Sequence, residues 1–196
     1  MTKIIGLTGG IGSGKTLVAN YIKSKGIPVY IADENAKKIM NLPSVVEAIK
    51  NTFGHEVIED KVVNRQKLSE LVFQSPEKLK KLNAIIHPIV KQDFDNWVKQ
   101  HHNYPFVVKE AAILFESGSH HFCDLIITVT APLAIRIQRV IDRDHTTEEQ
   151  VLARIKNQWD DEKKIALSHF VIQNITIEDT KNQVDDILKT LKNNQN

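Results

Sequence analysis

Residues 9–16 read GGIGSGKT and fit the pattern G-x-x-x-x-G-K-[ST] at every fixed position. A short β-branched run, KIIGLT at residues 3–8, comes directly before this segment, and good helix formers follow it over residues 15–25. We expect a buried strand, a glycine-rich turn and a helix in that order. In such a turn, backbone N–H groups and the helix N-terminus form a cradle for anions. The motif therefore predicts a phosphate-binding loop between a strand and a helix.

The residues of this loop indicate what it binds. Lys15 would bridge the β- and γ-phosphates of ATP, and the Thr16 hydroxyl would hold magnesium together with the ATP phosphates and waters. The Leu17 N–H lies in the same helical turn and can also face a phosphate. The residues expected to bind the nucleotide are Gly9, Gly10, Ile11, Gly12, Ser13, Gly14, Lys15, Thr16 and Leu17. The motif predicts ATP and Mg²⁺ as ligands but leaves the reaction open.

The rest of the chain alternates between short apolar runs and helical patterns. Further strands are expected at residues 27–31, 106–112, 125–130 and 170–173, and helices at residues 132–143 and 178–192. Pro28 near the start of the second strand indicates an edge position, and Thr146-x-x-Glu149 is a capping-box pattern that predicts another helix start. Alternating strands and helices imply right-handed crossovers and a parallel sheet covered on both faces. The predicted fold class is therefore α/β, a P-loop NTPase-type parallel sheet flanked by helices.

The segment between the second and third strands follows a different pattern, with helical pieces and loops. Residues 56–63 could form a small hairpin or an irregular segment. Ser75 and Pro76 are typical of an N-cap followed by proline at the first helical position. A long helix is expected from there to Lys99, with a break or kink near residues 87–88 because of the proline.

Composition excludes several protein classes. Hydrophobic residues make up 41% of the 196 residues and charged residues 26%, as in soluble globular proteins. No apolar run approaches the roughly 20 residues of a membrane span, so no membrane association is expected. The net charge is only +2, and no basic stripe indicates nucleic acid as a partner. Cys123 is the single cysteine, which excludes an internal disulfide and, with no signal-peptide pattern, favours a reducing cytoplasm.

Other motifs narrow the class of phosphate-loop protein. The chain has no Asn-Lys-x-Asp guanine motif and no Leu-Ser-Gly-Gly transporter signature, and the strand at residues 125–130 ends in Thr rather than Asp. A small kinase remains, which needs a carboxylate near the phosphate loop and arginines on a mobile lid. Asp33 follows the second strand, and strand ends gather beside the loop. This carboxylate could orient an acceptor hydroxyl, or it could cap a helix that begins at Glu34.

Three arginines form a candidate cationic surface. Arg136, Arg139 and Arg143 are spaced three and four residues apart, so they share one face of the helix after Pro132. Such a face could neutralise a transferring phosphate, or it could be an ordinary solvated surface. Glu116 also has two interpretations, since it could face a catalytic cleft or cap the turn that follows it.

Six sequence blocks resemble the dephospho-coenzyme A kinase family, and the resemblance extends over nearly the whole chain. The blocks are IIGLTGGIGSGKT (4–16), IPVYIAD (27–33), LNAIIHPIV (82–90), ILFESG (113–118), RVIDRD (139–144) and FVIQN (170–174). The resemblance implies transfer of the ATP γ-phosphate to the ribose 3′-hydroxyl of dephospho-coenzyme A, the last step of coenzyme A synthesis. It also implies a core of residues 1–32, 105–140 and 168–196, a helical substrate-binding region of residues 33–104 and a small helical lid of residues 141–167.

The same resemblance implies roles for single residues. Asp33, Lys15 and Arg139 would be catalytic, with Asp33 acting on the 3′-hydroxyl. Arg143 and Asn174 would join the loop in binding the nucleotide. The acceptor would be bound by Thr8, Asp33, Arg65, His87 and Pro88. A monomer with ATP and dephospho-coenzyme A as small-molecule partners is expected. The alternatives are another small nucleoside or nucleotide kinase and a nucleotide-sensing module without catalysis.

Three positions depart from the family pattern. Ile31 stands where the family often has the first aspartate of Asp-Ala-Asp, which removes a carboxylate from the expected surroundings of the metal. Glu110 stands at the aspartate of Asp-Val-Pro and keeps an acid one methylene further out. Gln173 replaces the acid before the final asparagine. These changes leave the expected reaction intact.

Overall fold

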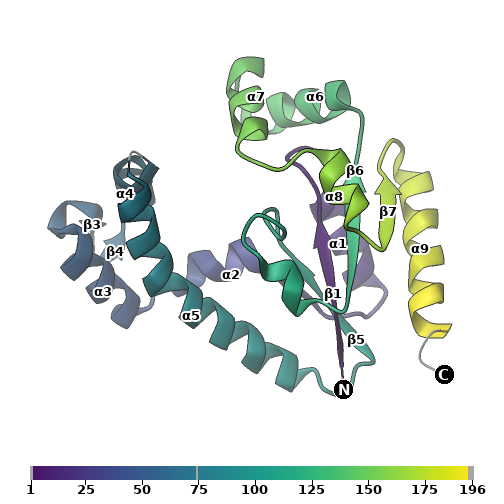
Figure 1. The fold of residues 1–196 in the computed structure, drawn as a ribbon, viewed down its shortest axis with the longest axis horizontal. Helices are drawn as coiled ribbons and strands as arrows, with labels where there is room; N and C mark the ends of the chain where they lie inside the picture. Colours follow the sequence, from purple (N-terminus) through teal and green to yellow (C-terminus); the bar gives the residue numbers. More distant parts are fainter. Residues whose placement is uncertain (1, 74, 194–196) are drawn as a thin grey trace. The chain divides into compact units, whose positions relative to one another are not determined.

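The computed structural model describes residues 2–73 and 75–193 of the chain. These residues form two compact units, which can be followed in Figure 1. The first lies within residues 1–31 and 101–196, and we call it the sheet unit. The second comprises residues 32–100, and we call it the helical unit. Residues 141–167, which the family resemblance implies to be a lid, belong to the sheet unit.

The sheet unit is built on five parallel strands in the order β2-β5-β1-β6-β7 (Figure 1). The strands are β1 (Lys3–Thr8), β2 (Val29–Ile31), β5 (Phe106–Glu110), β6 (Leu125–Thr130) and β7 (Phe170–Gln173). The parallel sheet predicted from the alternating pattern is confirmed. Strand β2 lies at an edge of the sheet, as Pro28 indicated. Strand β5 ends two residues earlier than predicted.

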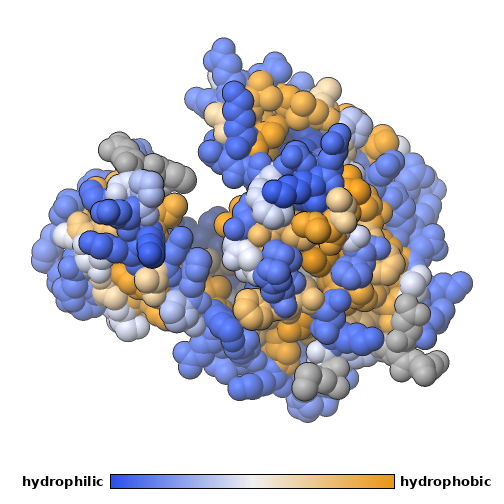
Figure 2. Space-filling view, viewed as in Figure 1, coloured by the Kyte–Doolittle hydropathy of each residue, from blue (hydrophilic) through white to orange (hydrophobic). Residues whose placement is uncertain are grey.

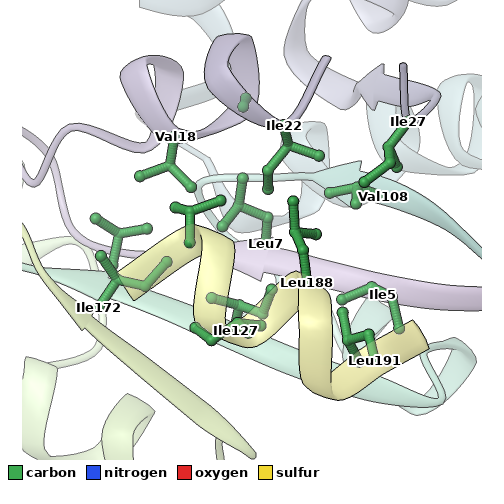
Figure 3. Packing of buried hydrophobic residues seen from close by; sticks show 14 of the residues in the cluster. Ile5, Leu7, Val18, Ile22, Ile27, Val108, Ile127, Ile172, Leu188 and Leu191 are labelled. Carbon is green, nitrogen blue, oxygen red and sulfur yellow. The ribbon is translucent and has the colours of Figure 1, made fainter. Parts of the chain in front are cut away.

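Helices α1 (Lys15–Ser24) and α9 (Ile177–Asn193), from opposite ends of the chain, pack against the sheet in one hydrophobic core. The other helices of this unit are α6 (Leu133–Asp144), α7 (Glu148–Lys156) and α8 (Asp161–Ala166), with a short 3-10 helix η2 (Ser119–Phe122). Figure 3 shows Val18 of α1 and Leu188 of α9 packed with Leu7 of β1 in one apolar cluster. Burial of one such side chain contributes roughly 1.5–3 kcal/mol. The cluster therefore fixes α1, and with it the end of the phosphate loop, against the sheet.

The surface of the sheet unit follows the amphipathic pattern of its helices. In Figure 2 the outward side of α9 is hydrophilic, while Val184 and Leu191 on its other side are buried.

Within the described residues, no helix is long and apolar enough to cross a membrane.

Helix α7 has a different cap from the one predicted. Thr147 is its N-cap, and the Thr147 side chain accepts a hydrogen bond from the Gln150 N–H at 3.4 Å. The prediction that Thr146 caps the helix is wrong, because the Thr146 hydroxyl donates to the Gln150 side chain instead. Both Thr146-x-x-Glu149 and Thr147-x-x-Gln150 fit the capping-box pattern, so the pattern alone does not choose between them.

The helical unit has a hydrophobic core of its own. Its elements are α2 (Ala32–Ile39), α3 (Pro43–Phe53), η1 (His55–Val57), β3 (Ile58–Glu59), β4 (Val62–Val63), α4 (Arg65–Phe73) and α5 (Pro76–Gln100). Val45 and Ile49 of α3 are fully buried in this core. Strands β3 and β4 pair as the small antiparallel hairpin expected over residues 56–63. Asp60 and Lys61 have φ of 48° and 65°, which is typical of a two-residue type I′ turn.

Helix α5 runs for 25 residues without interruption. The Ser75 Oγ accepts a hydrogen bond from the Lys78 N–H at 3.3 Å, which confirms the predicted start. A break at this point is excluded, because Pro88 lies inside the continuous helix, whereas the alternative of a kink stays a prediction. Proline removes one donor from the helix interior, but Ile85 and Ile89 on either side of it pack against the core of the helical unit. This packing maintains the helix across the proline.

Candidate active site

Residues 9–14 connect β1 to α1 and form the loop that the motif predicted. The Ser13 N–H donates to Gly10 O at 3.1 Å and closes the turn. The Lys15 Nζ donates to Gly9 O at 2.9 Å and to Gly10 O at 3.4 Å, so the ammonium lies over its own loop. The first turn of α1, which is described in full, carries no acidic side chain. The loop therefore presents an ammonium and a helix N-terminus to an anion.

Asn174 ties this loop to the end of the sheet. The residue is only 3% exposed; its Nδ2 donates to Ser13 O at 2.8 Å, and its Oδ1 accepts from Thr180 Oγ1 at 2.9 Å. Gly14 has a φ of 93°, and a Cβ at this position would overlap Asn174 Nδ2, so only glycine fits here. Asn174 thus fixes the position of the loop, and its contact with a nucleotide stays a prediction.

The three arginines of α6 have different surroundings. Arg136 is 6% exposed, and its Nε donates to Ile11 O in the loop at 2.9 Å. Arg139 is half-buried and donates to Asn174 O at 3.1 Å. Arg143 is exposed. The interpretation of one solvated face is therefore wrong for Arg136, and the burial of these three side chains decreases along the helix.

Arg143 and Arg154 converge on Asp144 at the junction of α6 and α7. The Arg143 Nε lies 2.7 Å from Asp144 Oδ1, and the Arg154 Nη1 lies 2.8 Å from Asp144 Oδ2. The hydrogen bond from Arg143, supported by Arg154, lowers the pKa of Asp144 to about 2. Among the described residues, the Arg143 guanidinium hydrogen-bonds only to Asp144. Its role at the nucleotide stays a prediction.

Thr8 and Glu110 lie at the carboxyl ends of neighbouring strands. Thr8 is fully buried, and its hydroxyl donates to Ala112 O at 3.5 Å. Glu110 is 5% exposed and pairs in register with Leu7 of β1 and with Ile31 of β2. The position that lacks the family's aspartate is therefore the cross-strand neighbour of Glu110. A carboxylate remains at this end of the sheet, although it comes from a different strand.

A buried ion pair that the sequence did not predict joins Glu116 to α8. The Lys164 Nζ lies 3.0 Å from Glu116 Oε1, and the lysine side chain is fully buried. The same oxygen accepts from the Trp159 N–H at 2.8 Å. Burial alone would raise the pKa of Glu116. The backbone N–H groups of Glu116 and Trp159 and the Lys164 ammonium instead lower this pKa below its usual value. Glu116 thus anchors residues 159–164, and a lysine in an amphipathic helix gives no sequence signal of full burial.

Asp33 lies in the first turn of α2, directly after β2 in the chain. The N-cap interpretation required a helix that begins at Glu34, and it is wrong because α2 begins at Ala32. The side chain is exposed, and a carboxylate in the first turn interacts favourably with the helix dipole. Its position inside the turn leaves the role toward an acceptor hydroxyl as a prediction.

The other acceptor-side candidates lie on two helices of the helical unit. Arg65 is the first residue of α4, and its Nη2 donates to Lys37 O of α2 at 3.1 Å. His87 and Pro88 lie in the middle of α5. The contact of Arg65 with Lys37 connects α4 to α2, the helix that carries Asp33. The binding roles of Arg65, His87 and Pro88 stay predictions.

Thr16, the predicted magnesium ligand, is exposed in the first turn of α1. Across residues 2–73 and 75–193, no group of three or more His, Cys, Asp or Glu side chains could hold a metal ion. At nucleotide sites Mg²⁺ takes few protein ligands and completes its coordination with phosphate oxygens and waters. One hydroxyl beside a phosphate loop fits that kind of site.

Comparisons with known proteins identify the family. The family model for dephospho-CoA kinase matches residues 3–179. The chain belongs to the dephospho-CoA kinase family. A dephospho-CoA kinase from Fusobacterium nucleatum is 40% identical over 190 residues, which cover 96% of this chain and 98% of that protein. These matches favour dephospho-CoA kinase over a different nucleotide kinase or a non-catalytic nucleotide sensor, and members of this family are ATP-dependent phosphotransferases.

Solved structures agree with this family. The crystal structure of TT1252 from Thermus thermophilus has a TM-score of 0.91 at 32% identity, with 96% of this chain and 97% of that one covered. The dephospho-CoA kinase from Campylobacter jejuni has a TM-score of 0.71 at 25% identity, with 99% of this chain and 100% of that one covered. Both likenesses extend over nearly the whole chain.

Proposed function

We propose that this chain transfers the γ-phosphate of ATP to the ribose 3′-hydroxyl of dephospho-coenzyme A, giving coenzyme A and ADP in the last step of coenzyme A synthesis. The observation that carries the proposal is the phosphate loop, where the Lys15 Nζ lies over Gly9 O and Gly10 O beside the helix N-terminus. The family match over residues 3–179 and the relative named dephospho-CoA kinase support the choice of acceptor.

On the phosphate side, the reaction depends on positioning and on charge. Phosphoryl transfer has a loose transition state in which charge spreads over the oxygens of the transferring group. The N–H groups of the loop hold the phosphates, and Lys15 neutralises the β- and γ-phosphates. Arg139, which lies beside the loop through its bond to Asn174 O, neutralises charge on the transferring group. The Thr16 hydroxyl would hold Mg²⁺ together with phosphate oxygens and waters, and the ion would supply positive charge that screens the phosphates.

On the acceptor side, Asp33 orients the ribose 3′-hydroxyl and accepts its proton. Arg65, His87 and Pro88 bind the remainder of the acceptor together with Thr8, which is buried at the end of β1. Orientation matters more than early deprotonation, because the attacking oxygen forms little bond in a loose transition state.

Residues 141–167 act as a lid that brings Arg143 to the nucleotide. A closed lid excludes water that would otherwise receive the phosphate. The lid exchanges the Arg143–Asp144 pair for a contact with phosphate when ATP binds.

The enzyme acts as a cytoplasmic monomer, a proposal supported by its single cysteine and balanced charge.

Product analysis tests this function. The purified chain is incubated with ATP, magnesium and dephospho-coenzyme A, and the products are identified by mass spectrometry. We expect coenzyme A, which is dephospho-coenzyme A phosphorylated at the 3′-hydroxyl, and an equal amount of ADP. With Lys15→Ala, both products should form at least ~10²-fold more slowly. Competition by nucleosides and nucleoside monophosphates at fixed ATP tests the acceptor class. Faster phosphorylation of one of these competitors would contradict the proposed acceptor.

A further inference from the structure

Ile11 lies in the phosphate loop between two glycines, and both of its backbone polar groups are bonded from outside the loop. The Ile11 N–H donates to Gln158 Oε1 at 2.9 Å. The Ile11 carbonyl oxygen accepts from Arg136 Nε at 2.9 Å. Neither partner belongs to the loop motif: Arg136 lies on α6 and Gln158 in the connection between α7 and α8. Residues distant in sequence thus fix two consecutive peptides of the loop.

Arg136 is itself held firmly in place. Its side chain is 7% exposed, and its Nη1 lies 2.8 Å from Asp161 Oδ2 at the start of α8. That carboxylate oxygen also accepts from Thr130 Oγ1 at the end of β6, at 2.8 Å. Gly12 has a φ of 77°, and a Cβ there would overlap the backbone of Arg136. The loop therefore packs directly on α6, and hydrogen bonds to Ile11 O and Asp161 Oδ2 orient the guanidinium.

The planarity of the peptide unit determines the direction of the Gly12 N–H. In a planar trans peptide, the C=O and the N–H point in opposite directions, and the described chain has no cis peptides. The Ile11 C=O and the Gly12 N–H belong to one peptide. Because the C=O is directed at Arg136, the Gly12 N–H points away from α6.

The preceding peptide is fixed in the same way. The Ile11 N–H is directed at Gln158, so the Gly10 C=O of that peptide points to the opposite side. There the Gly10 oxygen accepts from the Ser13 N–H at 3.1 Å and from Lys15 Nζ at 3.4 Å. Gln158 therefore orients a carbonyl that holds the catalytic lysine.

We propose that Arg136 and Gln158 are positioning residues for ATP binding. They orient two peptides of the loop so that the Gly12 N–H and the Lys15 ammonium face the phosphate chain. The proposal rests on the proposed function, since it concerns how the same loop holds ATP. Preorganised donors of this kind need no reorientation when the phosphate arrives.

A purely structural role predicts different kinetics. If the Arg136–Asp161 pair only held α6 to α8, its loss would lower the fraction of folded enzyme and leave the affinity of the remaining enzyme unchanged. If the pair positions the loop, the affinity for nucleotide phosphates decreases and the affinity for the acceptor does not. The KM for ATP and the Kd for ADP therefore separate the two roles.

Two single variants test the proposal. Arg136→Lys keeps a cation beside Asp161 but lacks the fork of donors that also reaches Ile11 O, and Gln158→Leu removes the other contact. We expect each to raise the KM for ATP and the calorimetric Kd for ADP by roughly 10-fold or more, as expected for a lost hydrogen bond in a charged site. The KM for dephospho-coenzyme A and the melting temperature should stay at wild-type values. Lys25→Met, which removes an exposed ion pair with Asp185, is the matched control.

A third variant guards against loss of folding. Arg136→Met combined with Asp161→Leu removes both charges of the pair, so no uncompensated charge stays buried. It should melt somewhat below the wild type, because Thr130 Oγ1 and Ile11 O lose their partners, but it should stay folded and still bind ADP weakly. Wild-type ATP and ADP constants in all three folded variants would overturn the positioning role, as would an equal decrease in apparent affinity for both substrates. Absence of ADP binding and of turnover in the wild type would instead overturn the proposed function.

Discussion

Single residues outside the motif hold the phosphate loop in place. Asn174 bonds to Ser13 O, Arg136 bonds to Ile11 O, and Gln158 accepts from the Ile11 N–H. Each of these partners satisfies a backbone group that would otherwise need water. These three residues therefore orient the loop, whereas the residues of the motif itself are the ones predicted to contact a ligand.

Asp33→Asn tests the acceptor side at this scale. If Asp33 orients the 3′-hydroxyl, asparagine keeps the size but loses the charge and the strong proton acceptor. We expect kcat to decrease by about 10²–10⁴-fold, as for a positioned acid-base group. The Kd for ATP and the melting temperature should barely change. Turnover close to the wild-type rate would remove Asp33 from the reaction, and Glu110 would become the next carboxylate to replace.

Lys164→Met tests the buried ion pair. Methionine fills much of the same volume but leaves Glu116 without its cation, and breaking a buried pair in this way costs about 3–5 kcal/mol. Urea denaturation should show this decrease in the free energy of unfolding. Lys164→Met combined with Glu116→Gln removes both charges and should recover a large part of the stability. An unchanged urea midpoint for the single variant would show that the pair contributes little.

At the scale of elements, the segment from the end of α6 to α8 has two kinds of attachment. Its outer part, α7, is joined to α6 by the exposed cluster around Asp144 and contributes one fully buried side chain, Val151. Its inner part is held by buried contacts, among them the Glu116–Lys164 pair and the stacking of Trp159 on Phe115 at 5.9 Å. Exposed ion pairs contribute little stability. We therefore expect motion in α7 rather than in the residues next to the loop.

Limited proteolysis tests the lid at this scale. Cleavage between residues 142 and 163 should slow when both substrates or a bisubstrate mimic are bound, because closure orders the segment. Within the segment, cleavage sites in α7 should precede sites in α8, since α8 has the buried attachments. Cleavage rates that do not respond to ligands would exclude a lid, and initial cleavage in α8 would contradict the division into outer and inner parts.

At the scale of the whole molecule, the two units have separate hydrophobic cores. One core contains the sheet with α1 and α9, and the other contains α3, α4 and one side of α5. The phosphate loop belongs to the first unit, while Asp33 and Arg65 belong to the second. The predicted nucleotide-binding and acceptor-binding residues are therefore divided between two hydrophobic cores.

Ile49→Ala tests the independence of the two cores. Ile49 is fully buried in the helical unit, and truncation of such a side chain costs about 2–5 kcal/mol. Hydrogen exchange should increase within residues 32–100, while the sheet unit and the Kd for ADP stay at wild-type values. Ile49→Val, with a smaller cavity, is the matched control. An equal increase in exchange in both units would contradict separate cores.

The sequence by itself determined the local elements. The motif at residues 9–16 predicted the strand, the loop and the helix, and the apolar runs predicted the parallel sheet. These features depend on neighbouring residues, through backbone freedom at glycine and through the period of apolar side chains. Family resemblance added the reaction and the acceptor.

Tertiary structure decided which polar side chains are buried and what they bond. Arg136, Arg139 and Arg143 have the same spacing signal, yet only Arg136 is enclosed, because α8 supplies Asp161 and the loop supplies Ile11 O. Contacts between distant segments also explain why the helix continues through Pro88. Packing on both sides of the proline compensates for the lost donor. Burial and hydrogen-bond partners depend on contacts between distant segments, and periodicity along a single chain carries no information about them.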